Sequence, residues 1–208
     1  MSAVLDAMQR RYATKAYDTS KKVSADDLHT ILEAMRLAPS SFGLQPWKFI
    51  VVENTETREQ LKANSRGQPQ VTDASHLIVL AVKKAITEAD VDAYMQSVAS
   101  TRNMPIEALA EYKWMIIGTV GSRDEASMRA WNAKQAYIAL GIWILTAAQL
   151  HIDATPMEGF DASKYDEVLG LGDYTTAVIM PIGYRAESDQ SQHYAKVRFS
   201  AEQIVEYK

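Results

Sequence analysis

The sequence of 208 residues contains no cysteine. This absence excludes disulfide bonds, zinc-thiolate sites, iron–sulfur clusters and a thiol nucleophile. Four histidines are present, but their spacing does not match a metal site. The chain also lacks G-x-G-x-x-G after a strand, G-x-x-x-x-G-K-S/T and the G-x-S-x-G nucleophile elbow. Metal catalysis and ordinary side-chain catalysis therefore have little support.

Positive charge is also not in excess. Lysine and arginine number 22 against 26 acidic residues, for a formal net charge of -4, so nothing in the bulk charge favours nucleic acid. The first 30 residues contain no apolar signal-peptide core, and no segment has the roughly 20 apolar residues that span a bilayer. We therefore expect one cytoplasmic domain over residues 1–208 that binds neither nucleic acid nor membrane.

The longest apolar stretch predicts a helix over residues 128–150. From Gln135 to Leu150 it carries no charge and no proline. Apolar residues on nearly every face require cover nearly all round. Small residues such as Ala139 and Gly141 would let another backbone approach closely. The cover comes either from the rest of the chain or from a second copy of this helix.

The remaining pattern predicts strands at 48–52, 76–82 and 174–182, and helices at 2–10, 24–38, 56–64 and 161–170. Residues 151–160 are expected to be a turn-rich segment. Two further helices, broken near 103–105, make residues 86–120 a helical excursion, which is either a lid over the active site or a second core patch. Strands separated by several helices without regular alternation predict the α+β class rather than a doubly wound sheet.

Five isolated polar or basic segments remain, at residues 11–15, 39–45, 67–70, 156–159 and 196–198. Taken singly, the basic cluster has a plain interpretation as solvated charge and the proline-bracketed loop as a rigid connector. His76 is expected to be structural, because no acid or nucleophile has a recognisable spacing to it. Together on a large apolar scaffold, these segments favour a bound cofactor that carries the chemistry.

Seven short motifs follow one another along nearly the whole chain. They are residues 11–18, 39–41 with 45–49, 68–70, 73–76, 134–135, 156–161 and 196–198. In order and spacing they resemble the FMN-dependent nitroreductase family, specifically its bacterial oxygen-insensitive NAD(P)H nitroreductase and NAD(P)H:flavin oxidoreductase branch. The resemblance implies a nitroreductase-like fold with a central, mostly antiparallel sheet flanked by helices. It also implies an intertwined homodimer with the long helix at its interface and two FMN molecules bound there.

The resemblance further implies which residues contact FMN. Those for the phosphate are Arg11, Lys196 and Arg198, which suit a dianion, with mainly backbone contacts from Tyr12 and Ala13. The residues expected to contact FMN from the other subunit are Pro39, Ser40 and Ser41. The residues expected at the flavin edges are Lys15, near N1 and O2, together with Gln68, Gln70 and Gln135. The residues expected along one flavin face are Pro156, Met157, Glu158 and Gly159. The backbone N–H groups of Glu158 and Gly159 would lie near flavin N5 and O4.

The same resemblance places Phe42 and residues 114–119, including Thr119, near the substrate channel. Gly67 stands where relatives often carry an asparagine, and Gly43 replaces a polar residue of some members. The implied activity is ping-pong transfer of hydride from NADH or NADPH, through FMN, to nitroaromatics, quinones or flavins, which are small planar acceptors. The alternatives are a flavin-dependent reductase or dehydrogenase of one specific metabolite, and a non-catalytic flavin-binding or structural helical dimer.

Overall fold

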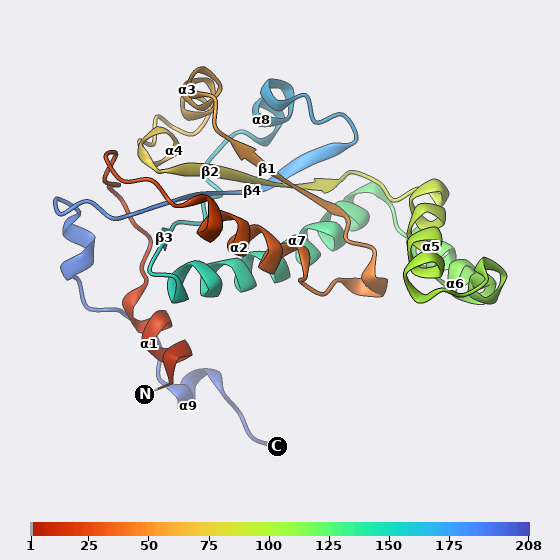
Figure 1. The fold of residues 1–208 in the computed structure, drawn as a ribbon. Helices are drawn as coiled ribbons and strands as arrows, with labels where there is room; N and C mark the ends of the chain where they lie inside the picture. The colour runs from red at the N-terminus through yellow and green to blue at the C-terminus, as the bar shows by residue number, and fades with distance from the viewer. Residues whose placement is uncertain (1) are drawn as a thin grey trace.

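The computed structural model describes residues 2–208 and is built around one open antiparallel sheet (Figure 1). Its strand order is β1-β2-β4-β3, with β1 at Trp47–Val52, β2 at His76–Lys83, β3 at Asp153–Ala154 and β4 at Tyr174–Gly183. β2 pairs with β1 and β4 along its length, so both its edges are occupied. Its near-continuous apolar run reflects burial on both faces.

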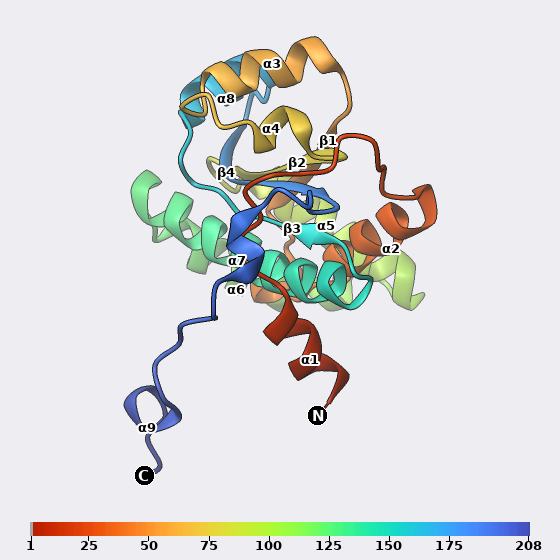
Figure 2. The same ribbon diagram turned by 90° about the vertical axis from the view of Figure 1, so that its left-hand side faces the viewer.

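Some of the helices cover the two faces of the sheet. The helices of the described residues are α1 Ala3–Arg10, α2 Ala25–Arg36, α3 Thr55–Ala63, α4 Gln70–Asp73, α5 Glu88–Arg102, α6 Ala110–Gly121, α7 Glu125–Gln149, α8 Ala162–Leu169 and α9 Ala201–Ile204. In both ribbon views α3, α4 and α8 lie on one side of the sheet, and α2 and α7 lie on the other (Figures 1 and 2). The predicted α+β class is confirmed.

Each face of the sheet has its own hydrophobic core, because alternate side chains of a strand point to opposite faces. Ile78 and Leu80 of β2 pack with Trp143 of α7, whereas Leu77 and Val79 pack with the α3 and α8 side. All of these side chains are fully buried. The two cores hold β2 and β4 rigidly between the helical layers.

The long helix begins three residues earlier than predicted, at Glu125, because the Asp124 side chain accepts a hydrogen bond from the Ser127 N–H at 2.7 Å and caps it. One chain by itself does not cover this helix on all sides. Trp143 is buried, but Tyr137 is 39% and Ile138 43% exposed. An apolar face of α7 is therefore left open to solvent.

The helical excursion has its own core. α5 and α6 project together beyond one end of the sheet (Figure 1). A separate hydrophobic cluster joins them, including Met95 of α5 and Ile116 of α6. The predicted break is where α5 ends, at Asn103, whose left-handed conformation (φ 49°) terminates the helix.

One strand lies where turns were predicted. Asp153 and Ala154 form β3, and Met157 continues the pairing by a bridge to Ile179. The prediction of a turn-rich segment over residues 151–160 therefore missed this short strand. A strand of two residues is too short to show periodicity, and it forms because the edge of β4 offers backbone groups that need partners.

Both ends of the chain lie away from the sheet. α1 and α9 stand below the body in both views, and the C-terminal segment extends outward (Figure 2). Apolar side chains of this segment face solvent, with Phe199 75% and Tyr207 94% exposed. Across residues 2–208, the structure contains no helix with the length and apolar character needed to cross a membrane.

Candidate functional site

The predicted phosphate-binding residues, far apart in sequence, line one pocket of about 520 Å³. Two segments line it, and each is called a wall here: residues 9–13, at the end of α1, carry Arg11, and residues 191–198, in the C-terminal segment, carry Lys196 and Arg198. The Lys196 ammonium donates a hydrogen bond to the Arg11 carbonyl and joins the walls. Tyr12, Ala13 and Pro156, which the resemblance assigns to FMN contacts, also line the pocket. None of its described lining residues is acidic.

The cations of this pocket destabilise one another. Burial and then repulsion from Arg198 lower the pKa of Arg11. Burial and then repulsion from Arg11 and Arg198 lower the pKa of Lys196. Because no lining carboxylate offsets these charges, an anion bound in the pocket would relieve both the desolvation and the repulsion. A phosphate, with several acceptor oxygens, suits such a set of donors.

The pocket lies at the C-terminal end of α7. Arg10, which also lines it, donates to the Ala148 carbonyl and contacts the His151 ring. A cation there satisfies a terminal carbonyl and complements the helix dipole. The wall is further held by Tyr12, whose ring lies 4.5 Å from the Arg185 guanidinium.

The loop at residues 156–159 reaches the middle of α7. The Glu158 carboxylate accepts a hydrogen bond from the Tyr137 hydroxyl, and burial followed by this bond raises the pKa of Tyr137. Tyr137 precedes Ala148 by 11 positions, about 16 Å along a helix rising 1.5 Å per residue. Met157 bonds Ile179 through both its backbone N–H and its carbonyl and buries its side chain in the core, so its role in the loop is structural. The candidate site is thus elongated along α7.

The glutamines of the motif at residues 68–70 differ in their surroundings. The Gln68 amide nitrogen donates to the Gly159 carbonyl at 3.1 Å and supports the loop. Gln70 is only 7% exposed, and its Oε1 atom has no hydrogen-bond partner among the described residues. A buried acceptor without a partner is costly, so Gln70 offers an acceptor for a ligand donor. The Lys15 side chain is exposed, and its backbone N–H donates to the Asp189 Oδ2, which holds this segment in place.

The residues predicted to act from the other subunit form a second group. The Ser41 N–H donates to the Gln135 Oε1 at 2.9 Å, which attaches this loop to α7. Ser40 accepts the Gln45 N–H, and Pro39 is exposed. Gln135 and Tyr137 are two residues apart, about 200° around a helix of 3.6 residues per turn. Ser41 and Glu158 therefore contact opposite sides of α7.

The predicted channel residues lie with the excursion. Phe42 packs edge-on to Tyr112 at 6.4 Å between ring centroids, and the Tyr112 hydroxyl donates to the Phe42 carbonyl at 3.0 Å. This bond holds Phe42 in a left-handed backbone conformation (φ 58°) that is strained for a phenylalanine. The Thr119 hydroxyl donates to the Met115 carbonyl within α6. Thr119 lies about one helical turn from Ile116, which belongs to the hydrophobic cluster of the excursion.

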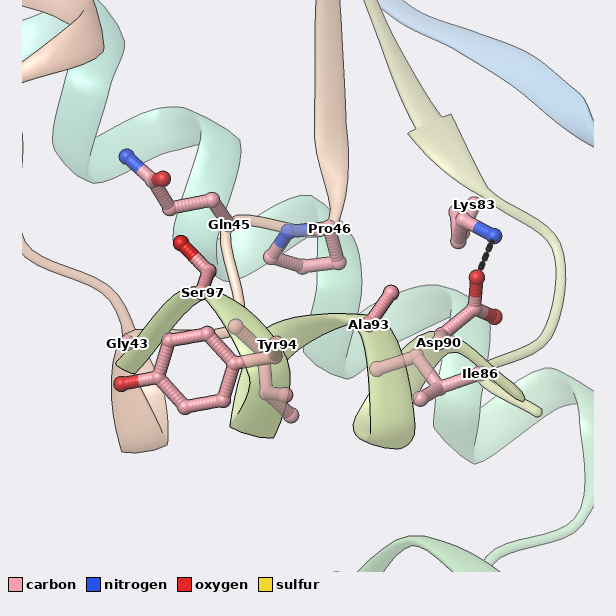
Figure 3. A pocket seen from close by; sticks show the side chains of 10 residues that line it. Gly43, Gln45, Pro46, Lys83, Ile86, Asp90, Ala93, Tyr94 and Ser97 are labelled. Carbon is pink, nitrogen blue, oxygen red and sulfur yellow. Dashed lines mark hydrogen bonds and ion pairs between the residues drawn. The ribbon is translucent and has the colours of Figure 1, made fainter. Parts of the chain in front are cut away.

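A second cavity of about 280 Å³ lies behind this loop (Figure 3). Residues 43–46 form one side. Tyr94 of α5 and the ion pair between Lys83 of β2 and Asp90 of α5 form the other. A side chain at Gly43 (φ 77°) would overlap the Tyr94 hydroxyl. Glycine at this position therefore allows the loop to pack closely on α5.

Replacing Gly43 with alanine is expected to lower the free energy of unfolding by about 2–4 kcal/mol, because strain at positive φ and steric overlap add. Gly67→Ala is the matched control: Gly67 also has positive φ (68°), but an added Cβ there meets open space. Urea unfolding of both variants measures the difference. Equal losses would show that Tyr94 does not restrict residue 43.

Several side chains of the site were not identified from sequence. Asp189, Arg185 and Asp153 organise the pocket wall, and Tyr137 fixes Glu158. Each stands alone in sequence, without a spacing that marks it. Arg10 had one signal, its place beside Arg11. The structure has no group of three or more His, Asp or Glu side chains arranged for a metal ion within residues 2–208.

Comparison with known proteins places this geometry in a family. The sequence model of the nitroreductase family matches residues 8–184. The chain belongs to the nitroreductase family. It is 36% identical over 223 residues to a Staphylococcus haemolyticus protein whose name provisionally describes an NAD(P)H nitroreductase, covering 98% of this chain and 96% of the relative. A similarly named Staphylococcus epidermidis protein is 37% identical with the same coverage.

Solved structures of this family share the fold. A Bacillus subtilis protein described provisionally as a nitroreductase superposes with a TM-score of 0.87 at 21% identity, covering 98% of both chains. An Exiguobacterium sibiricum protein described in the same way, in complex with FMN, has a TM-score of 0.83 at 22% identity, covering 100% of this chain and 98% of its own. The nitroreductase-like fold predicted from the sequence is confirmed.

Proposed function

We propose that this nitroreductase-family protein is an oxidoreductase that binds FMN and uses NADH or NADPH to reduce small planar acceptors. The observation that carries the proposal is the pocket of Arg11, Lys196 and Arg198, in which cations converge without an acidic lining residue. The relatives' names support a nicotinamide donor, and the FMN complex of the Exiguobacterium protein supports the cofactor.

The described residues fit FMN at two separate positions. The cation pocket suits the phosphate, since bound anion would relieve the repulsion that lowers the pKa of Lys196. The buried Oε1 of Gln70 would accept a hydrogen bond from a donor on the same ligand. Between them, Lys15 and the backbone of Glu158 and Gly159 would contact the flavin, and Gln68 supports that loop.

We assign the second half of the site to a second copy of the chain. Ser41 and Glu158 lie on opposite sides of α7, so one flavin on one side of the helix cannot contact both. The open apolar face of α7 at Ile138 and Gly141, and the exposed apolar C-terminal segment, supply surfaces that a homodimer would bury. In this arrangement Pro39, Ser40, Ser41 and Gln135 act on the partner's flavin.

Bound FMN would supply the redox chemistry, taking hydride from NADH or NADPH and passing electrons to a nitroaromatic, quinone or flavin in ping-pong order. The protein's part is to bind and orient. The cation pocket anchors one end of the ligand, and Phe42 with the exposed residues of α6 provides apolar walls against which planar acceptors pack. Lys15 places positive charge near the flavin edge, where reduction accumulates negative charge.

Lys15→Met is expected to lower the FMN midpoint potential by tens of millivolts. A unit charge about 4 Å away contributes at most roughly 4 kcal/mol at an effective dielectric near 20, and about 1.4 kcal/mol corresponds to 30 mV for two electrons, which sets a ceiling near 90 mV. Lys164→Met, on the exposed surface of α8, is the control. Spectroelectrochemical titration measures both. An unchanged midpoint with FMN still bound would remove Lys15 from this role.

The function is tested by the visible spectrum of the purified protein during anaerobic titration with NADH and then NADPH. A nitroaromatic, a quinone and riboflavin are then added in turn. Bleaching by the nicotinamide and recovery with at least one acceptor are the expected results. Bleaching without recovery by any acceptor would instead favour a non-catalytic flavin-binding dimer. A folded protein that takes up no FMN would contradict the proposal.

A further inference from the structure

One buried carboxylate joins the two walls of the cation pocket. Asp189 precedes the short 3-10 turn at Gln190–His193, and its Oδ1 accepts the Ser191 N–H at 2.9 Å. Its Oδ2 accepts the Tyr12 hydroxyl at 2.9 Å and the Lys15 N–H at 2.8 Å. Tyr12 belongs to the first wall of the pocket and Ser191 to the second. Each oxygen of Asp189 therefore holds one wall.

The environment of Asp189 requires a carboxylate. Its side chain is almost completely buried, at 3% exposure, and every group bonded to it is a donor, including the Ala16 N–H at 3.3 Å. Burial alone would raise the pKa of Asp189, but the hydrogen bonds from Lys15, Ser191 and Tyr12 outweigh it and lower that pKa below its ordinary value. The group is therefore charged at neutral pH.

We propose that Asp189 is a positioning residue that holds Arg11 on one wall and Lys196 and Arg198 on the other at the separation needed to bind a phosphate. Asp189 acts through Tyr12, Lys15 and Ser191 and does not itself line the pocket. This inference rests on the proposed FMN function, because it assigns the phosphate of FMN to this pocket.

The geometry also explains why asparagine cannot replace Asp189. The amide has nearly the same shape but carries one acceptor and one N–H₂ donor. If its oxygen faces Tyr12 and Lys15, the amide nitrogen faces the Ser191 N–H. If it turns round, the amide nitrogen faces the Tyr12 and Lys15 donors. Either orientation sets donor against donor and releases one wall.

The test compares the affinities of wild type and Asp189→Asn for FMN and for riboflavin, which lacks the phosphate. Fluorescence quenching on the FMN-depleted protein measures the four dissociation constants. FMN affinity is expected to fall about 10-fold or more, the size expected for disrupted charged hydrogen bonds. Riboflavin affinity is expected to fall by a smaller factor, because Asp189 bonds only the backbone N–H of Lys15 and not its side chain. An unchanged ratio of the two affinities would overturn the inference, since a general loss of structure weakens both ligands.

Asp166→Asn is the matched control. Asp166 accepts a backbone N–H and a hydroxyl, both from Thr176, at 2.7 and 2.9 Å, in the contact between α8 and β4. This variant should lower thermal stability and leave the FMN-to-riboflavin ratio unchanged. A ratio that falls equally in both variants would show that any weakened fold produces the effect, and would contradict the role of Asp189.

Tyr12→Phe provides a second route if Asp189→Asn does not fold. It removes one donor to Asp189 and keeps the ring on Arg185, so a smaller but selective loss of FMN affinity is expected. A Tyr12→Phe protein without this selective loss would count against the inference.

Measurements on the wild type distinguish a failure of this inference from a failure of the proposed function. A wild-type protein that shows no preference for FMN over riboflavin would refute the phosphate site itself.

Discussion

Replacing both Arg11 and Lys196 with glutamine is expected to weaken FMN binding by about 100- to 10,000-fold. Each position removes a charge-assisted interaction worth roughly 1.5–3 kcal/mol, and 1.4 kcal/mol corresponds to a factor of ten. Isothermal titration with FMN measures the loss. Arg10→Gln is the control, because Arg10 lines the same pocket but is already bonded to Ala148. Unchanged FMN affinity in the double variant would contradict the phosphate site.

The same double variant is expected to raise the melting temperature of the FMN-free protein. In the wild type, Arg11 and Lys196 are partly desolvated, and they repel each other and Arg198. Both effects lower the pKa of Lys196, and burial and repulsion from Arg198 lower the pKa of Arg11. A lysine whose pKa is lower in the folded than in the unfolded chain opposes folding while it is protonated. The wild-type apoprotein should therefore gain stability as the pH rises through the folded pKa of Lys196 toward its ordinary value near 10.4. Lys196→Gln should flatten this rise in apoprotein thermal melts.

Gly141→Glu is expected to convert the proposed homodimer to a folded monomer that does not retain FMN. Gly141 lies on the exposed face of α7, and an added Cβ would meet no atom of its own chain within 4 Å. Within the monomer, glutamate in place of glycine favours the helix by roughly 0.5–1 kcal/mol. At a helix contact between two chains, it introduces both bulk and a desolvated charge.

Analytical ultracentrifugation and circular dichroism measure this second outcome together. Gly121→Glu is the matched control, since Gly121 also lies in an exposed helical position with open space around its Cβ. That variant should remain a dimer with FMN bound. A Gly141→Glu protein that sediments as a dimer and stays yellow would remove α7 from the interface.

Local sequence patterns predicted most elements because those elements satisfy local rules. The apolar run from His76 to Val82 is buried on both faces as β2. Ser24 and Asp161 cap α2 and α8 through their side chains, as such residues do at helix starts. β3 was missed because two residues carry no periodicity, and the strand exists only beside β4.

The candidate site was predicted in part, and mostly through the motifs. Arg11, Lys196 and Arg198 were identified, and the structure brings them into one pocket. Asp189 and Tyr137 were not, because one carboxylate and one hydroxyl among many have no distinguishing neighbours in sequence. Their roles follow only from what surrounds them after folding.

The sequence by itself determined the three longer strands, the helix caps and the long apolar helix, because hydrophobic periodicity and capping act over a few residues. It also marked the basic segments at residues 11–15 and 196–198. Only the tertiary structure decided that Arg11 and Lys196 meet across 185 positions, and that α7 is covered on one side alone. These contacts join irregular segments whose separation depends on the packing of the whole sheet. No local pattern encodes that distance.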